Sequence, residues 1–113
     1  MAALCAALAD HRGAMWDAGR FRVTSRYSEQ AAERTRQTRS AVTDPLVRVS
    51  LLVPEAAPAA RRAAGAVYAM RDATTAGELE AARAAAVRAE TELVDAVRSA
   101  LAGDGTVRGV LPG

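Results

Sequence analysis

The amino-acid sequence predicts an all-α protein, an antiparallel up-down four-helix bundle with a kinked second helix and a frayed C-terminal tail. Alanine, the residue with the highest helix propensity, fills 29 of the 113 positions. Apolar residues recur every three or four positions along four segments, the spacing that places side chains on one face of a helix. Clusters of Pro, Gly, Ser and Thr separate these segments. Because the connections are short, consecutive helices are expected to run in opposite directions and to pack like a coiled coil.

The first helix is expected over residues 2–23. Its inward positions alternate by four and three residues along the chain. They are Leu4, Leu8, His11, Met15 and either Phe21 or Arg22. Gly13 and Gly19 lower the helix propensity of this segment. The polar cluster at residues 24–28 ends the helix.

The second helix is expected over residues 29–53. Ser28 is a suitable N-cap, and Glu29 places an acid in the first turn, where the helix dipole favours it. Pro45 removes a backbone hydrogen bond, so the chain either kinks there or starts a new helix. The apolar register continues in phase across Pro45, and this favours the kink.

The third helix is expected over residues 55–73, after Pro54, and the fourth over residues 76–102. The segment Thr75-Ala76-Gly77-Glu78 fits a capping box, in which the Thr75 hydroxyl accepts from the Glu78 amide and the Glu78 carboxylate reaches back. Gly103 is a candidate left-handed C-cap. Residues 1–102 are therefore expected to form one domain, followed by a flexible tail at 103–113.

The predicted core is thin, because Ala and Val bury little area each. The sequence is therefore expected to give a marginally stable bundle, or one that gains stability from a partner subunit. A helical hairpin that completes its core only on dimerising is the competing architecture.

Reactive side chains are scarce in this sequence. There is one Cys and one His, and there is no Lys, Asn or Ile. Cys5 has no partner for an internal disulfide, and His11 has no carboxylate at helical spacing to orient it. No ligand pairs for zinc or a di-iron centre and no phosphate-binding loop are present. We therefore expect no enzyme, no catalytic residue, no cofactor and no metal; a small-molecule pocket near His11, Trp16 and Tyr68 is a remote alternative.

The charge distribution gives the one functional indication of weight. Between positions 20 and 39, six arginines stand against two glutamates, whereas residues 72–104 are rich in acids. A basic end of this kind either contacts nucleic acid or anionic lipid, or meets an acidic face of another helix or copy. The candidate contact residues are Arg20, Arg22, Arg26, Arg34, Arg36 and Arg39.

The longest apolar run, residues 1–9, is too short to span a membrane and lacks the charged start of a secretory signal. The expected location is therefore the cytoplasm. The run begins within an amphipathic pattern without a capping residue, which is the pattern expected if an upstream segment is absent.

Three stretches resemble a group of small actinobacterial helical proteins, some described as Kil-type accessory proteins of conjugative-plasmid spread. The stretches are 11–16 (HRGAMW), 38–47 (TRSAVTDPLV) and 67–73 (VYAMRDA). The resemblance covers roughly residues 1–102 and implies a non-enzymatic role, with no catalytic residue to carry over. Members of the group often have an N-terminal membrane segment, which this chain lacks.

Taken together, the residues and the resemblance lead to one hypothesis for function. We expect a cytoplasmic, non-enzymatic module that acts through protein–protein contacts, with a protein partner or as a homo-oligomer, in a plasmid- or phage-type accessory role. Nucleic-acid binding through the arginine-rich segment 20–39 is the alternative, and membrane binding is not expected.

Overall fold

The computed structural model describes the backbone of residues 1–110 and the side chains of residues 1–103. This part of the chain folds into four α-helices and contains no strand. The helices are α1 (Ala2–Val23), α2 (Glu29–Leu52), α3 (Ala57–Tyr68) and α4 (Ala76–Val110). Short 3₁₀ helices, η1 (Pro54–Ala56) and η2 (Ala69–Asp72), extend α3 at its two ends. The predicted all-α class and its four helices are confirmed.

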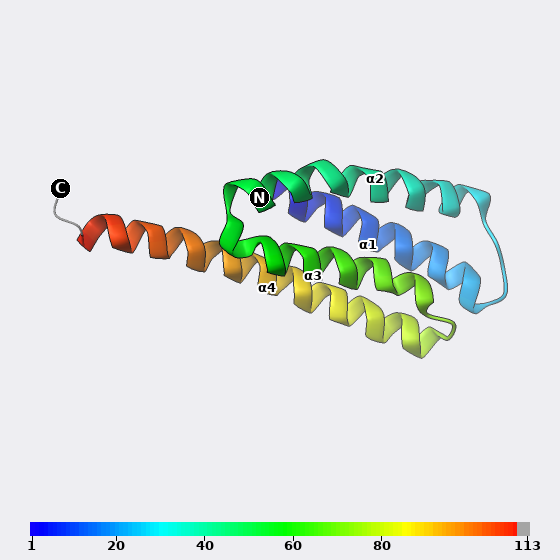
Figure 1. The fold of residues 1–113 in the computed structure, drawn as a ribbon. Helices are drawn as coiled ribbons and strands as arrows, with labels where there is room; N and C mark the ends of the chain where they lie inside the picture. The colour runs from blue at the N-terminus through cyan, green and yellow to red at the C-terminus, as the bar shows by residue number, and fades with distance from the viewer. Residues whose placement is uncertain (111–113) are drawn as a thin grey trace.

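The helices lie along one another in an elongated molecule of 63 × 25 × 15 Å. Figure 1 shows α1 beside α2 and α3 beside α4. The loop between α1 and α2 lies at one end, and the turn from α2 into η1 lies at the other end, near the N-terminus. Beyond that second end, the last turns of α4 extend away from the other helices.

The end of α1 is fixed by a Schellman motif. Ser25 adopts a left-handed conformation, with φ of 58°. The Arg26 amide donates to the Phe21 carbonyl at 2.7 Å, and the Ser25 amide donates to the Arg22 carbonyl at 3.0 Å. The Thr24 hydroxyl donates to the carbonyls of Arg20 and Phe21 as well. These bonds satisfy carbonyls that the last turn of a helix otherwise leaves without partners.

The start of α2 is as predicted, because the Ser28 hydroxyl accepts from the Ala31 amide at 3.1 Å. Pro45 lies inside α2, which continues without interruption to Leu52. The alternative of a separate helix starting at Pro45 is therefore wrong. The helix ends at Leu52, and Val53 leaves the helical conformation with φ of −132° and ψ of 74°, since the α region is disfavoured for a residue before proline.

The capping box before α4 forms with a different partner for the carboxylate. The Glu78 amide donates to the Thr75 hydroxyl at 3.1 Å, as predicted. The Glu78 carboxylate, however, accepts from the amide and the hydroxyl of Thr74, both at 2.9 Å. These hydrogen bonds hold the pKa of Glu78 below its usual value. The carboxylate thus fixes the residue before the cap rather than the cap itself.

The predicted boundary at the C-terminal end is wrong. Gly103 was expected to end the helix in a left-handed conformation, yet no glycine in the described residues has a positive φ, and α4 continues to Val110. Glycine lowers helix propensity by about 1 kcal/mol relative to alanine but does not by itself terminate a helix. Residues 103–110 are therefore helical rather than a tail, and residues 111–113 lie outside the described part.

Side chains from all four helices meet in one core. The largest fully buried side chains are Leu4, Leu8, His11, Val42, Val67, Met70, Leu79 and Leu93. Most inward positions predicted from the helical spacing are buried. Phe21 is an exception, at 38% exposed, and Leu101, which continues the spacing of Leu93 and Val97 along α4, is 57% exposed. At the end of α1 the alternative position, Arg22, turns inward instead.

The two helices α1 and α4 approach closely at Gly19. A Cβ atom built on Gly19 would lie 2.7 Å from Cδ1 of Leu79. A side chain at position 19 would therefore displace a leucine that is 1% exposed. The glycine that weakens α1 as an isolated helix is what allows Leu79 to pack against it.

Candidate anion-binding hollow

The structure divides the six predicted contact arginines into two groups of three. Arg20, Arg26 and Arg34 line one hollow on the surface. Arg22, Arg36 and Arg39 are engaged with other groups of the protein. The sequence alone gave no means of separating the groups, since all six lie within 20 residues of chain.

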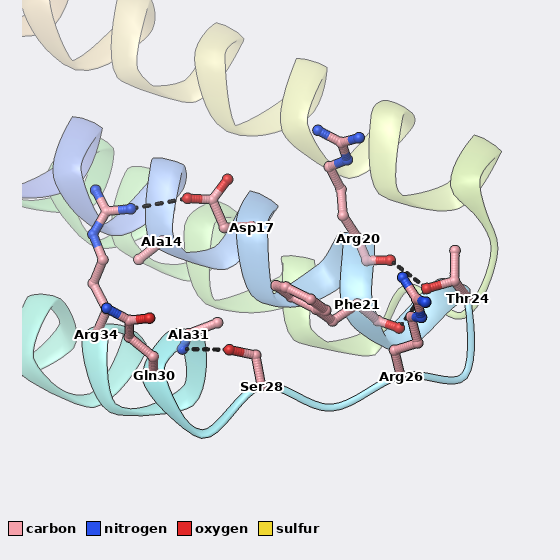
Figure 2. A pocket seen from close by; sticks show the side chains of 10 residues that line it. All are labelled: Ala14, Asp17, Arg20, Phe21, Thr24, Arg26, Ser28, Gln30, Ala31 and Arg34. Carbon is pink, nitrogen blue, oxygen red and sulfur yellow. Dashed lines mark hydrogen bonds and ion pairs between the residues drawn. The ribbon is translucent and has the colours of Figure 1, made fainter.

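The hollow lies between the last turns of α1 and the first turns of α2, and it encloses about 620 Å³. Figure 2 shows the Phe21 ring between the two helices, with Arg26 beside Thr24 and Arg34 toward the other side. The hollow is open to solvent. Its lining residues are Ala14, Asp17, Arg20, Phe21, Thr24, Arg26, Ser28, Gln30, Ala31 and Arg34.

The charge of the lining is positive, because three arginines oppose a single acid, Asp17. Arg34 donates to the Asp17 carboxylate at 2.9 Å, and both side chains are about half exposed. Arg20 and Arg26 make no ion pair among the residues whose side chains are described. Their guanidinium groups are therefore available to an anion. Phe21, which is 38% exposed, supplies an aromatic ring to the same lining.

The other three arginines have structural partners. Arg22 donates from Nε to the Ala73 carbonyl at 2.9 Å and from an Nη atom to the Met70 carbonyl at 3.0 Å. These carbonyls end the helical segment that contains α3, so Arg22 joins α1 to that end. The guanidinium of Arg39 lies over the Tyr68 ring, 4.6 Å from its centroid.

Arg36 belongs to an exposed group of charges on α2. Its guanidinium contacts the carboxylates of Glu29 at 3.1 Å and Glu33 at 2.6 Å, which raises the pKa of Arg36. A hydrogen bond from the Tyr27 hydroxyl and then the contact with Arg36 lower the pKa of Glu29. Exposed pairs of this kind contribute little to stability. They do, however, reduce the positive charge that Arg36 presents to a ligand.

His11 is buried, at 1% exposed, in a cluster with α2 and α3 side chains. Its Nδ1 lies 2.8 Å from the Thr38 hydroxyl, and its ring meets the Tyr68 ring edge-on at 5.5 Å. Thr38 also lies 2.9 Å from the Arg34 carbonyl, which can only accept. With the Thr38 hydroxyl proton on that carbonyl, Nδ1 of His11 is the donor to the hydroxyl oxygen, and the roles in this hydrogen bond follow the tautomer of His11.

This arrangement keeps His11 neutral. Its Nε2 atom is buried and has no hydrogen-bond partner. Burial, and then the charge of Arg39, lower the pKa of His11 to about 4. The residue is thus a packed core histidine. The remote alternative of a shared pocket is not supported, because Trp16 faces a separate hollow beneath Arg83.

One ion pair was missed by reasoning from the sequence. Glu90 lies on α4 with its side chain only 15% exposed, and its two carboxylate oxygens lie 2.7 and 2.6 Å from one Arg12 nitrogen. The pair joins α1 to α4. No signal in the sequence links positions 12 and 90, because they come together only when the helices pack.

The described residues offer no evident site for a metal or for a membrane span. Within them, no three His, Cys, Asp or Glu side chains lie close enough to hold a metal ion. None of their helices combines the length and the apolar character needed to cross a bilayer.

Comparisons with known proteins agree with the resemblance noted from the sequence. The pattern of a family described as KilB plasmid transfer protein matches residues 1–101. Protein KilB of Streptomyces lividans is 49% identical over 57 residues, which are 48% of this chain and 39% of that protein. The match thus spans about two fifths of the relative's length. No solved structure matches the chain significantly.

Proposed function

The chain belongs to the KilB plasmid transfer protein family, and we propose that it serves plasmid transfer as a non-enzymatic accessory module that binds another protein. In this proposal the four helices form an antiparallel up-down bundle that works in the cytoplasm. The bundle presents a surface to a partner and carries out no chemistry of its own. The surface that we propose binds the partner is apolar.

The supporting observation is a group of exposed apolar side chains at one end of the molecule. Leu51 is 75% exposed, Leu52 is 74% exposed and Val47 is 52% exposed, all in the last turns of α2. Met1 and Leu101 are exposed as well. Val97, one turn before Leu101, lines a small hollow together with Met1 and Leu52, so α1, α2 and α4 all contribute to this end. We call the five exposed residues Met1, Val47, Leu51, Leu52 and Leu101 the apolar end. Exposed apolar patches of this kind mark interaction sites.

Plasmid transfer measured with surface variants tests this proposal. Leu51→Asp places a charge in the apolar end without disturbing the core, and Ser40→Asp adds the same charge at an exposed position earlier on α2. We expect Leu51→Asp to lower the transfer frequency at least tenfold, and Ser40→Asp to leave it unchanged. Circular dichroism checks that both variants fold. Equal transfer by the two folded variants would contradict the proposal.

Nucleic-acid binding is the second candidate, and the hollow is the observation that favours it. Arg26 and Phe21 line the hollow together, and Arg20 extends from the same turn of α1 toward α4, so a phosphate backbone could pass along this end with one base stacked on Phe21. Arg22, Arg36 and Arg39 are assigned a smaller part, because each has a partner within the protein.

Fluorescence anisotropy with labelled single-stranded DNA tests the second candidate. A double variant, Arg20→Gln with Arg26→Gln, should weaken binding and lower the slope of log K against log salt by about 1.5. The matched control is Arg61→Gln with Arg62→Gln, which removes the same charge from exposed positions on α3. An equal loss in both double variants would mean that only net charge matters, and absence of binding at low salt would end this candidate.

A further inference from the structure

Helix α4 is far longer than the helices it packs against. It contains 35 residues, whereas α1 and α2 contain 22 and 24. The last buried residue of α4 is Val97 in the part whose side chains are described. The thirteen residues 98–110 continue for about 20 Å at the rise of an α-helix. Figure 1 shows this extension, coloured orange to red, passing beyond the end where α2 turns into η1.

The extension lacks what normally stabilises a helix. Isolated helices of this length are marginal in water, and most helical stability in proteins comes from packing an apolar face. Its sequence includes Gly103, Gly105 and Gly109, which disfavour helix further. A helical extension here therefore calls for a surface to pack against, and the other helices of the same copy do not reach it.

The apolar face of α4 continues into the extension. Leu93 and Val97 are buried in the core, and Leu101 is the next residue at a spacing of four. Leu101 is 57% exposed, and no buried residue follows Val97 in the part of α4 whose side chains are described. One turn before Leu101, Val97 lines a hollow of about 80 Å³ together with Met1 and Leu52. The hollow thus connects the core of the bundle with the apolar end.

From these observations we propose that the occupant of the apolar end is a second copy of this chain. The extension of each copy lies antiparallel against the extension and the apolar end of the other, with Leu101 near the two-fold axis. This inference rests on the proposed function, because it names the partner of that surface. A two-fold contact is self-complementary, so each copy supplies both the missing helix and the surface that covers Leu52.

The charges around the apolar end fit a contact between identical copies. Arg48 lines the hollow with Met1 and Leu52, Glu55 lies in η1, and Asp95 and Arg98 lie on α4 on either side of Val97 in the sequence. All four are exposed, and none makes an ion pair within the residues whose side chains are described. Because positive and negative residues are equal in number, two copies of this surface carry no net charge that would make them repel each other.

The mass of the protein in solution, measured by light scattering over a range of concentrations, tests the proposal. We expect the wild-type protein to approach the mass of a dimer at micromolar concentrations. Leu101→Glu should weaken the dimer at least tenfold. Val87→Glu is the matched control, because Val87 is an exposed valine on α4 in the part alongside α3. Wild-type protein that stays monomeric at the highest concentration would overturn the proposal, and so would equal losses in the two variants.

Cross-linking gives a second readout that does not depend on affinity alone. In a Cys5→Ser background, Leu101→Cys should form a disulfide-linked dimer under mild oxidation, whereas Val87→Cys should not. Equal cross-linking of the two variants would contradict the placement of Leu101 near the axis. The outcome separates the two proposals. A monomer in which Leu51→Asp still lowers plasmid transfer would refute the second copy and leave the proposed function standing.

Discussion

The buried neutral histidine makes a specific prediction about stability against pH. His11 has a pKa of about 4 in the folded protein, compared with 6.5 in the unfolded chain. Between these values the unfolded chain binds a proton that the folded protein does not. Stability is therefore complete above pH 6.5 and is lost as pH falls toward 4. Linkage gives a loss of about 2 kcal/mol from pH 7 to pH 5, and about 3 kcal/mol by pH 4.

Urea unfolding followed by far-UV circular dichroism, repeated across this pH range, measures the effect. His11→Phe is the control, because it keeps a ring in the cluster and removes the titration. Glu29 and Glu78 also have lowered pKa values, so both proteins lose stability in stronger acid. The difference between wild type and variant isolates His11. If the free energies of unfolding of the two proteins fall in parallel between pH 7 and pH 5, the reasoning about the buried imidazole is wrong.

Three further predictions concern stability and are checked by thermal or urea unfolding. Leu93→Ala should destabilise by about 2–4 kcal/mol, since Leu93 is fully buried; a change below about 1 kcal/mol would refute its core position. Ser25→Gly should stabilise by about 1 kcal/mol, because glycine adopts the left-handed conformation without steric penalty, and a destabilised variant would count against that geometry. Gly19→Ala should destabilise by about 1 kcal/mol, because displacing Leu79 outweighs the gain in helix propensity. A more stable Gly19→Ala protein would show that Leu79 moves aside freely.

The helices themselves could be predicted because their determinants are local. The first residues and caps of α2 and α4 follow from Ser28 and Thr75, and the inward faces follow from the spacing of Leu, Val and Met. The prediction that α4 ends at Gly103 was wrong because it, too, used only local sequence. A rule that ends helices at glycine uses only local sequence, and Gly103 has no neighbours that force a left-handed turn.

The candidate site could be predicted only in part. Arginine-rich composition located the segment 20–39, but it did not show that Arg22 turns inward to carbonyls while Arg20 and Arg26 stay at the surface in the lining of the hollow. That division depends on how α1, α2 and η2 meet. The Arg12–Glu90 pair depends on packing in the same way, since 78 positions of chain separate the two residues. Contacts between distant segments leave no periodic signal in a single sequence.

The alanine-rich face of α3 limits how this protein can change over time. The side chains that α3 buries, apart from Val67, are methyl groups, and they are Ala57, Ala59, Ala60, Ala63 and Ala64. Because all five are buried, a longer side chain at any of them would have to displace packed neighbours. We therefore expect substitutions to accumulate at the outward positions of α3 rather than at these five buried alanines.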